Sequence, residues 1–270
     1  MRRVAHLSDI HFGRIEPATL EPLVVALRRL APDVVAISGD LTQRARRGQF
    51  RAARAYLERL PGPRIVVPGN HDIPLYDVFS RFARPLSNYR RYVTADLAPV
   101  YADDEIALVG INTARSRTFK RGRVNARQIE AAVRQLIDSR APTKMVVTHH
   151  PFDLPAGHAD RELVGRAGMA MQALAEAGVD VFLAGHLHLS STLHTAARYR
   201  LLGHSALVVA AGTATSSRVR GAEKNSFNLL TATPEKIVVE RHAFDGKAFR
   251  PGGTEIFRRG GAGWERIPAA

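Results

Sequence analysis

Apolar positions along the chain follow two alternating periods. Short runs of apolar and β-branched residues at 3–8, 34–38, 65–67, 106–111, 145–148 and 181–184 predict buried strands. Residues 19–30, 49–60, 125–139 and 167–177 carry apolar residues at helical spacing, and Gly178 predicts the end of the last of these helices. Strands that alternate with helices favour a mainly parallel sheet with right-handed crossovers.

The pattern changes after residue 190. Strands are predicted at 207–211, 227–231 and 237–243 with no long helix between them, which favours a second, more antiparallel sheet packed on the first. We expect one domain over residues 1–250, followed by an irregular, glycine-containing C-terminal tail at 251–270. The stretch 74–100 is rich in arginine and aromatic residues, and we expect a largely helical insertion there, close to the mouth of the site.

Composition narrows the chemistry. The 270-residue chain can bury a full core, and it contains no cysteine, so any metal must be held by nitrogen and oxygen. No apolar run is long enough to span a bilayer, and the first residues enter a strand pattern without the layout of a signal peptide. We therefore expect a cytoplasmic protein with no membrane span.

The formal net charge is +14. A basic surface speeds encounters with phosphate-bearing partners, so nucleic acid is a candidate partner. Only five of the 39 basic residues are lysine, however, and the arginine bias of a GC-rich genome would produce the same charge without a function. Both interpretations stay open.

Five polar motifs each follow one of the apolar runs. They are Asp9-Ile10-His11, Gly39-Asp40, Gly69-Asn70-His71-Asp72, His149-His150 and Gly185-His186-Leu187-His188. Because the functional crevice of an open α/β sheet lies beyond the carboxyl ends of its strands, we expect these motifs to converge there. Carboxylates, an amide and several imidazoles form the ligand set of a two-metal hydrolytic centre.

The spacing within the motifs suits metal binding. Asp9 and His11 are two residues apart at a strand exit, so both side chains can chelate one ion. His186 and His188 have the same spacing, and their imidazoles could each reach a different ion. Asp40 follows a glycine that allows a sharp turn, and its two carboxylate oxygens suit it to bridge two cations.

Other polar residues in the motifs allow more than one interpretation. Asp72 is either a turn former or a carboxylate that orients an imidazole. His150 precedes a proline, and we expect it behind the ligands or against the substrate rather than among the ligands. Four histidines have no partner at ligand spacing and are interpreted as ordinary core or surface residues: His6, His194, His204 and His242.

With these motifs in order, residues 1 to about 190 resemble the calcineurin-like metallophosphoesterase superfamily, and most closely its bacterial class III cyclic nucleotide phosphodiesterases and glycerophosphodiesterases. The resemblance implies an α/β fold, a four-layer α/β/β/α sandwich of two mixed sheets. It also implies that Asp9, His11, Asp40 and His188 hold one metal ion, while Asp40, Asn70, His149 and His186 hold another. His71 would then face the substrate phosphate and either stabilise charge or protonate the leaving oxygen.

The implied activity is hydrolysis of small phosphodiesters, such as 3′,5′-cyclic nucleotides, by a hydroxide that bridges two metal ions, with Asp40 and His71 as catalytic residues. Mixed nitrogen and oxygen ligands favour Mn²⁺, Fe²⁺/Fe³⁺ or Zn²⁺. A metal-dependent nuclease acting on DNA or RNA is the alternative enzyme, and a non-catalytic binding protein is a third reading. A homodimer is left open.

Substrate contacts are predicted outside the motifs. Arg115 and Arg117 follow the strand at 106–111, and Arg121 and Arg123 lie in the loop behind them. Their guanidinium groups could clamp a phosphate, or they could simply be solvated. His158, in the loop after the fourth motif, is a weaker candidate of the same kind.

Overall fold

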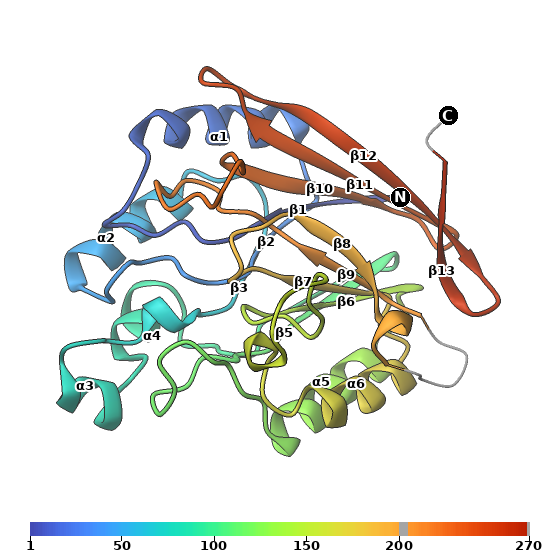
Figure 1. Ribbon diagram of the computed structural model, residues 1–270, viewed down its shortest axis with the longest axis horizontal. Coiled ribbons are helices and arrows are strands. Elements are labelled where there is room, and N and C mark those ends of the chain that lie inside the picture. The colour runs from blue at the N-terminus through green and yellow to red at the C-terminus, as the bar shows by residue number, and fades with distance from the viewer. Residues whose placement is uncertain (200–204, 269–270) are drawn as a thin grey trace.

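The structure is built from two β-sheets packed face to face, with helices on both outer faces (Figure 1). It is a computed structural model that describes residues 1–199 and 205–268, so His204 lies outside the described residues. Within those residues the first sheet has the strand order β13-β12-β11-β10-β1-β2-β3 and the second the order β4-β5-β6-β7-β9-β8. Both sheets mix parallel and antiparallel pairs.

The elements have the following bounds. The first sheet contains β1 (Arg2–Leu7), β2 (Val34–Ile37), β3 (Arg64–Val66), β10 (Ser226–Ala232), β11 (Lys236–Phe244), β12 (Phe249–Gly260) and β13 (Gly263–Ile267). The second contains β4 (Val100–Ala102), β5 (Ile106–Gly110), β6 (Thr143–Val147), β7 (Val181–Ala184), β8 (Ser191–His194) and β9 (Leu207–Ala210). The helices are α1 (Pro17–Leu30), α2 (Arg47–Leu57), α3 (Val78–Ala83), α4 (Ser87–Tyr92), α5 (Ala126–Asp138) and α6 (Ala167–Glu176), with 3-10 turns η1 (Asn70–Asp72), η2 (Asp160–Glu162) and η3 (Thr195–Ala197).

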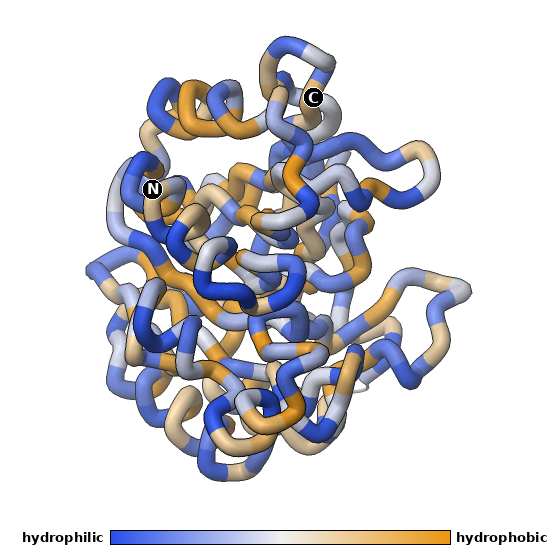
Figure 2. The backbone as a smooth tube through the Cα atoms, turned by 90° about the vertical axis from the view of Figure 1, so that its left-hand side faces the viewer, coloured by the Kyte–Doolittle hydropathy of each residue, from blue (hydrophilic) through white to orange (hydrophobic). Residues whose placement is uncertain are grey.

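Successive side chains of each strand point to opposite faces of the sheet, and the apolar ones build three layers. In β1, Leu7 packs toward α1 and α2, whereas Val4 faces the second sheet. In β6, Met145 faces the first sheet, whereas Val146 packs toward α5 and α6. In Figure 2 the coil of α1 at the top alternates between orange and blue, as expected for a helix with one apolar face. The predicted four-layer α/β/β/α sandwich of two mixed sheets is thus confirmed.

The division between the sheets differs from the prediction. Residues after 190 do not form the second sheet alone, because β10 pairs antiparallel with β1 and extends the first sheet. β9 instead continues the second sheet, parallel to β7. Both faces of these strands are buried, so their apolar runs carry no signal that could tell the two sheets apart.

The C-terminal stretch 251–270 is not an irregular tail as far as it is described. β12 and β13 form a hairpin at the edge of the first sheet, and Trp264 buries its ring and donates from Nε1 to Asp180 at 3.0 Å. The glycines that suggested irregularity mark a register shift opposite Arg241 and the tight turn before Gly263, whose φ is +110°.

The insertion after the third motif is helical only in part, because α3 and α4 cover 12 of the 27 residues at 74–100 and the rest is mostly turn and loop. α4 lies beside α2 (Figure 1). Leu75 and Arg81 from this insertion line the cavity described below.

Candidate metal centre

The predicted ligands lie just beyond the carboxyl ends of parallel strands from both sheets. Asp9 and His11 follow β1, Asp40 follows β2, Asn70 follows β3, His149 follows β6, and His186 and His188 follow β7. Because these strand ends meet at one edge of the sandwich, the structure brings residues separated by up to 179 positions into one cluster.

One half of the cluster combines Asp9, His11 and His188. The Nε2 atoms of His188 and His11 lie 3.1 and 3.4 Å from Asp9 Oδ1 and 3.3 Å from each other. All three side chains are buried, and their ligand atoms are close enough together to hold one metal ion.

The other half is organised around His149. Its Nε2 lies 3.3 Å from Asp40 Oδ2 and 3.1 Å from Asn70 Oδ1, and its ring lies 5.1 Å from the ring of His186. Asp40 Oδ2 is also 3.7 Å from His11 Nε2, so this carboxylate lies between the two halves.

Backbone carbonyls fix two imidazoles in a ligand tautomer. His149 donates from Nδ1 to the Ser38 carbonyl at 2.7 Å, and His188 donates from Nδ1 to the Arg218 carbonyl at 2.8 Å. Each ring therefore turns the lone pair of its other nitrogen, Nε2, toward the cluster, which is the arrangement of metal-binding histidines.

The backbone is strained where the ligands leave the strands. Five of the seven predicted ligands have positive φ: Asp9 (54°), His11 (57°), Asp40 (53°), His186 (71°) and His188 (57°). This conformation costs on the order of 1 kcal/mol each for residues other than glycine. Strain concentrated in this way is typical of functional sites, where it directs side chains inward.

The donor set fits divalent cations. Burial, the largest single influence, would raise the pKa of Asp9, but His188, His11 and His149 together outweigh burial and hold this pKa well below its usual range. Burial opposes ionisation of Asp40 in the same way, and His149 lowers the pKa of that carboxyl. Asp9 Oδ1 is buried without a hydrogen-bond donor, and such an orphaned anionic oxygen suits a cation. The backbone also packs closely against this carboxylate, because any side chain at Gly185 would collide with Ser8 and Asp9.

Asp72 acts on the backbone rather than on an imidazole. Its carboxylate accepts N–H bonds from Leu41 (3.2 Å), Thr42 (2.9 Å) and Gly69 (2.9 Å), so it joins the loop that carries Asp40 to the next motif loop. Burial, reinforced by Asp40, raises the pKa of Asp72 to about 6. Of the two interpretations drawn from the sequence, the turn former is the one that matches these contacts.

His150 uses both ring nitrogens away from the cluster. Nε2 donates to the Lys120 carbonyl at 3.0 Å, and Nδ1 accepts from the Thr113 hydroxyl at 2.7 Å. Burial holds the pKa of His150 well below its usual range, so the ring is neutral. The ring packs 4.8 Å from His149 and 4.5 Å from His186, which places it behind these two residues.

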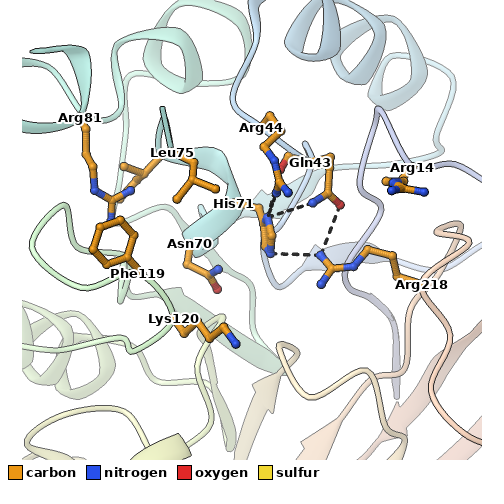
Figure 3. A pocket seen from close by; sticks show the side chains of 11 residues that line it. Arg14, Gln43, Arg44, Asn70, His71, Leu75, Arg81, Phe119, Lys120 and Arg218 are labelled. Carbon is orange, nitrogen blue, oxygen red and sulfur yellow. Dashed lines mark hydrogen bonds between the residues drawn. The ribbon is translucent and has the colours of Figure 1, made fainter. Parts of the chain in front are cut away.

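A cavity of about 500 Å³ opens beside the cluster, with Asn70 and His71 in its wall (Figure 3). His71 donates from Nδ1 to the Gln43 carbonyl at 3.0 Å, and Arg218 donates to His71 Nε2 at 3.1 Å. His71 also donates its backbone N–H to Asp40 at 2.8 Å. Burial lowers the pKa of the imidazole.

Most of the residues predicted to contact substrate lie outside the cavities at the cluster, with Arg121 as the exception. Arg115 directs its guanidinium to the carbonyls of Asn112 and Ala114 and to Gln128 on α5. None of Arg115, Arg117, Arg123 and His158 lines this cavity or the adjoining one of about 270 Å³. The start of the loop after β5 turns back onto α5, which carries Arg115 away from the cluster, whereas Lys120 and Arg121 further along the same loop line the cavities. His158 pairs with Glu162 at 2.8 Å.

Other basic residues take their place, and sequence reasoning missed nearly all of them. The cavities at the cluster are lined by Arg14, Arg44, Arg81, Lys120, Arg121, Arg161, Arg218 and Arg220, of which the sequence singled out Arg121 alone. These residues come from six separate loops or helices, so no local pattern announces them. The arginine content of the insertion at 74–100 was the one signal that pointed to Arg81.

Among the described residues, the histidines without ligand-spaced partners lie outside the cluster. His6 is buried with Nε2 2.9 Å from the Ser38 hydroxyl, and burial lowers its pKa to about 3. His242 stacks on Phe227, with ring centroids 4.9 Å apart, and burial lowers its pKa to about 4. His194 contacts the ring of Phe257.

None of the helices formed by the described residues has the length and apolarity that crossing a bilayer requires.

Comparison with known proteins finds a phosphoesterase family and two relatives named as phosphodiesterases. The profile of the family described as calcineurin-like phosphoesterase matches residues 2–190. A glycerophosphodiester phosphodiesterase of Enterobacter lignolyticus is 30% identical over 172 residues, which are 59% of this chain and 60% of that protein. A probable cyclic nucleotide phosphodiesterase of a Synechococcus strain is 24% identical over 159 residues, covering 55% and 57% of the two chains.

The fold has solved counterparts as well. A purple acid phosphatase from yellow lupin seeds superposes with a TM-score of 0.69 at 16% identity, covering 94% of this chain and 53% of that one. At this identity the likeness concerns the fold alone. The matches to the two phosphodiesterases span about 60% of the length of those relatives.

Proposed function

Because the chain belongs to the calcineurin-like phosphoesterase family, we propose that it is a phosphodiesterase whose two metal ions are held by the cluster at the strand ends. The observation that carries this proposal is the convergence of seven side chains with nitrogen and oxygen donor atoms from two sheets, with Asp40 between the halves. A complete ligand set argues against the alternative of a non-catalytic binding protein.

In this proposal Asp9, His11, Asp40 and His188 hold one ion, and Asp40, Asn70, His149 and His186 hold the other. When bound, two such ions lower the pKa of water and neutralise the oxygens of a phosphate under attack. Mn²⁺, Fe²⁺/Fe³⁺ and Zn²⁺ suit these ligands. Asp72 and His150 keep the ligands in place through the contacts described above.

His71 and Arg218 are the chain's own groups for the substrate. Both line the cavity at the cluster, and the Arg218 guanidinium supplies a fixed positive charge for a phosphoryl oxygen. His71 faces the same space and would either stabilise charge or, after taking up a second proton on Nε2 in place of the Arg218 hydrogen bond, give that proton to the leaving oxygen.

The first candidate substrates are small phosphodiesters such as 3′,5′-cyclic nucleotides. The names of the two curated relatives, a glycerophosphodiester phosphodiesterase and a probable cyclic nucleotide phosphodiesterase, support a diester as substrate. The second candidate, a nuclease activity on DNA or RNA, is favoured by the number of basic side chains that line the cavities.

Hydrolysis of bis(p-nitrophenyl) phosphate tests the proposal. Protein stripped with a chelator and reloaded with Mn²⁺, Fe²⁺, Co²⁺ or Zn²⁺ should release p-nitrophenolate, and faster from this diester than from the monoester p-nitrophenyl phosphate. Asp40→Ala should lower both metal content and turnover, the latter by at least about 100-fold. Asp104→Asn, which removes an exposed carboxylate, is the matched control. Absence of turnover with every metal would refute the proposal.

A further inference from the structure

The basic side chains at the cavity lack counter-ions. Arg14, Arg44, Lys120 and Arg218 all line it. No carboxylate in the described part of the chain lies within ion-pair distance of any of them. Solvated arginines are ordinary on an open surface, but several directed into one cavity repel one another unless an anion joins them.

Arg81 also has no carboxylate partner among the described residues, and unlike the other cavity arginines it is buried. Its side chain is only 3% exposed, and its hydrogen bonds go to the carbonyls of Pro74 and Thr118, which carry no charge. Its Nε is buried without a partner. A buried guanidinium with no anionic partner is costly, so the wall of the cavity at Arg81 is built to receive an anion.

The cations stand on both sides of the proposed reaction centre. Figure 3 shows Arg81 with Phe119 at one end of the cavity and Arg14 with Arg218 at the other, while Asn70 and His71 lie between them. A phosphodiester with a single charge would occupy only the middle. A substrate with further phosphates on both sides of the scissile one would use the ends as well.

The basic lining continues from the cavity beside His71 into another cavity of about 500 Å³, which lies between α2, α3 and α4 and is distinct from the one of about 270 Å³. Arg44 and Leu75 line both the His71 cavity and this helix-bounded cavity, and Arg46, Arg47, Arg84 and Arg91 line the helix-bounded one. Arg46 and Arg47 stand at the N-terminus of α2, where the helix dipole is also positive and the first turn has no acidic residue. This placement opposes helix stability in the absence of a bound anion.

Aromatic rings accompany the cations. Phe119, Tyr76 and Phe79 are 61%, 73% and 69% exposed, so much of each ring is open to solvent. Each carries a guanidinium over its ring, from Arg81 (4.3 Å), Arg44 (5.7 Å) and Arg84 (5.7 Å) respectively. Exposed rings interleaved with unpaired arginines provide stacking surfaces for bases beside contacts for phosphates.

We propose that the His71 cavity and the helix-bounded cavity together form a binding track for single-stranded oligonucleotide. The scissile phosphate would lie at Asn70 and His71, with flanking phosphates at Arg81 and at Arg14 and Arg44. Bases would stack on Phe119 and Tyr76. The inference rests on the proposed phosphodiesterase function and names its substrate class. A duplex does not expose its base faces to such rings, whereas a single strand does.

Chain length is the first test. Metal-loaded protein is assayed with a 3′,5′-cyclic nucleotide, a dinucleotide with one phosphodiester, and single strands of three, five and ten nucleotides. KM should fall from the dinucleotide to the pentanucleotide and then level off. Equal KM values for the pentanucleotide and the dinucleotide would overturn the track.

Charge substitution is the second test. Arg14→Gln and Arg44→Gln should each lower the ratio of kcat/KM for the pentanucleotide to kcat/KM for bis(p-nitrophenyl) phosphate by about tenfold, because a charge-assisted contact is lost. Each should also reduce the slope of log K against log salt for oligonucleotide binding by about 0.7. Arg127→Gln, an exposed arginine on α5 with the same loss of charge, is the control. Slopes that match the control would contradict the proposal.

The outcomes separate the inference from the function on which it rests. Turnover of bis(p-nitrophenyl) phosphate without length dependence refutes the track and leaves the phosphodiesterase intact. Binding of oligonucleotide, measured by fluorescence anisotropy, without turnover of any diester refutes the enzyme and leaves the track. Binding to vesicles of phosphatidylserine but not to single strands would assign the exposed rings to a membrane and overturn the inference.

Discussion

Arg218 donates a hydrogen bond of 3.1 Å to Nε2 of His71. Because the Gln43 carbonyl takes the Nδ1–H of the same ring, His71 is held as a neutral imidazole with its Nε2 lone pair facing the guanidinium. The fixed positive charge at this point of the cavity therefore belongs to Arg218, a residue that none of the five motifs contains.

Arg218→Gln should lower turnover of bis(p-nitrophenyl) phosphate by about 100-fold, the usual cost of removing one preorganised donor from a developing negative charge. Metal content should be retained, because it is the backbone carbonyl of Arg218 that accepts from His188. Steady-state kinetics and metal analysis on the same sample check both expectations. Arg218→Lys should recover part of the activity, and a wild-type rate in Arg218→Gln would rule out the role.

His71→Ala should keep its metals and lose about 10²–10⁴-fold in turnover if the imidazole protonates the leaving oxygen. The loss should then be large for an alkyl leaving group and small for p-nitrophenolate, which needs no proton. A comparison of two diesters that differ only in the leaving group measures this. Equal losses on both would show that His71 serves to position Arg218.

Asp72→Ala should destabilise the site by removing the acceptor for three backbone N–H groups in two loops. Each buried donor left unsatisfied costs about 1–3 kcal/mol, so urea unfolding should show a clear loss of stability. Metal affinity should fall about 10- to 100-fold because Asp40 and Asn70 lose their relative position. Unchanged metal affinity in a destabilised variant would limit Asp72 to a role in folding.

His242→Phe should reduce the sensitivity of the fold to acid. The pKa of His242 is about 4 in the fold, below its ordinary value near 6.5, so the unfolded chain takes up a proton that the folded chain excludes. Stability from this site is complete above pH 6.5 and is lost as the pH falls toward 4, with a size of about 1–2 kcal/mol. Urea unfolding at pH 7.5, 6, 5 and 4 should show a smaller decline for the variant. If the free energy of unfolding declined equally with pH in the variant and the wild type, His242 would not be a source of the acid sensitivity.

The sequence was sufficient to predict the ligand cluster because each ligand follows a strand. In a parallel sheet, the end of a strand specifies the edge at which a side chain lies, so Asp9, Asp40 and Asn70 could be expected together at one edge of the first sheet. That His149 and His186 from the second sheet meet them depends on how the two sheets dock, which no local pattern records.

The substrate side could not be predicted in the same way. Arg14, Arg81 and Arg218 line one cavity only because the two sheets and the insertion fold around it. Their spacing along the chain gives no sign of this shared location. Arg115 was selected for being near a strand end, yet its loop turns back and its guanidinium binds carbonyls. Strand pairing such as that of β10 with β1 is likewise non-local.

The position of β1 in the first sheet sets the order in which the centre can form during synthesis. β1 leads directly into Asp9 and His11, but it lies between β2 and β10, so half of its ladder waits for residues 226–232. While the ribosome is still adding those residues, a nascent chain already contains all seven ligands on an unfinished sheet. In the proposed function, metal is therefore expected to bind late, and a chain truncated just after His188 should carry every motif and still fail to hold the ions.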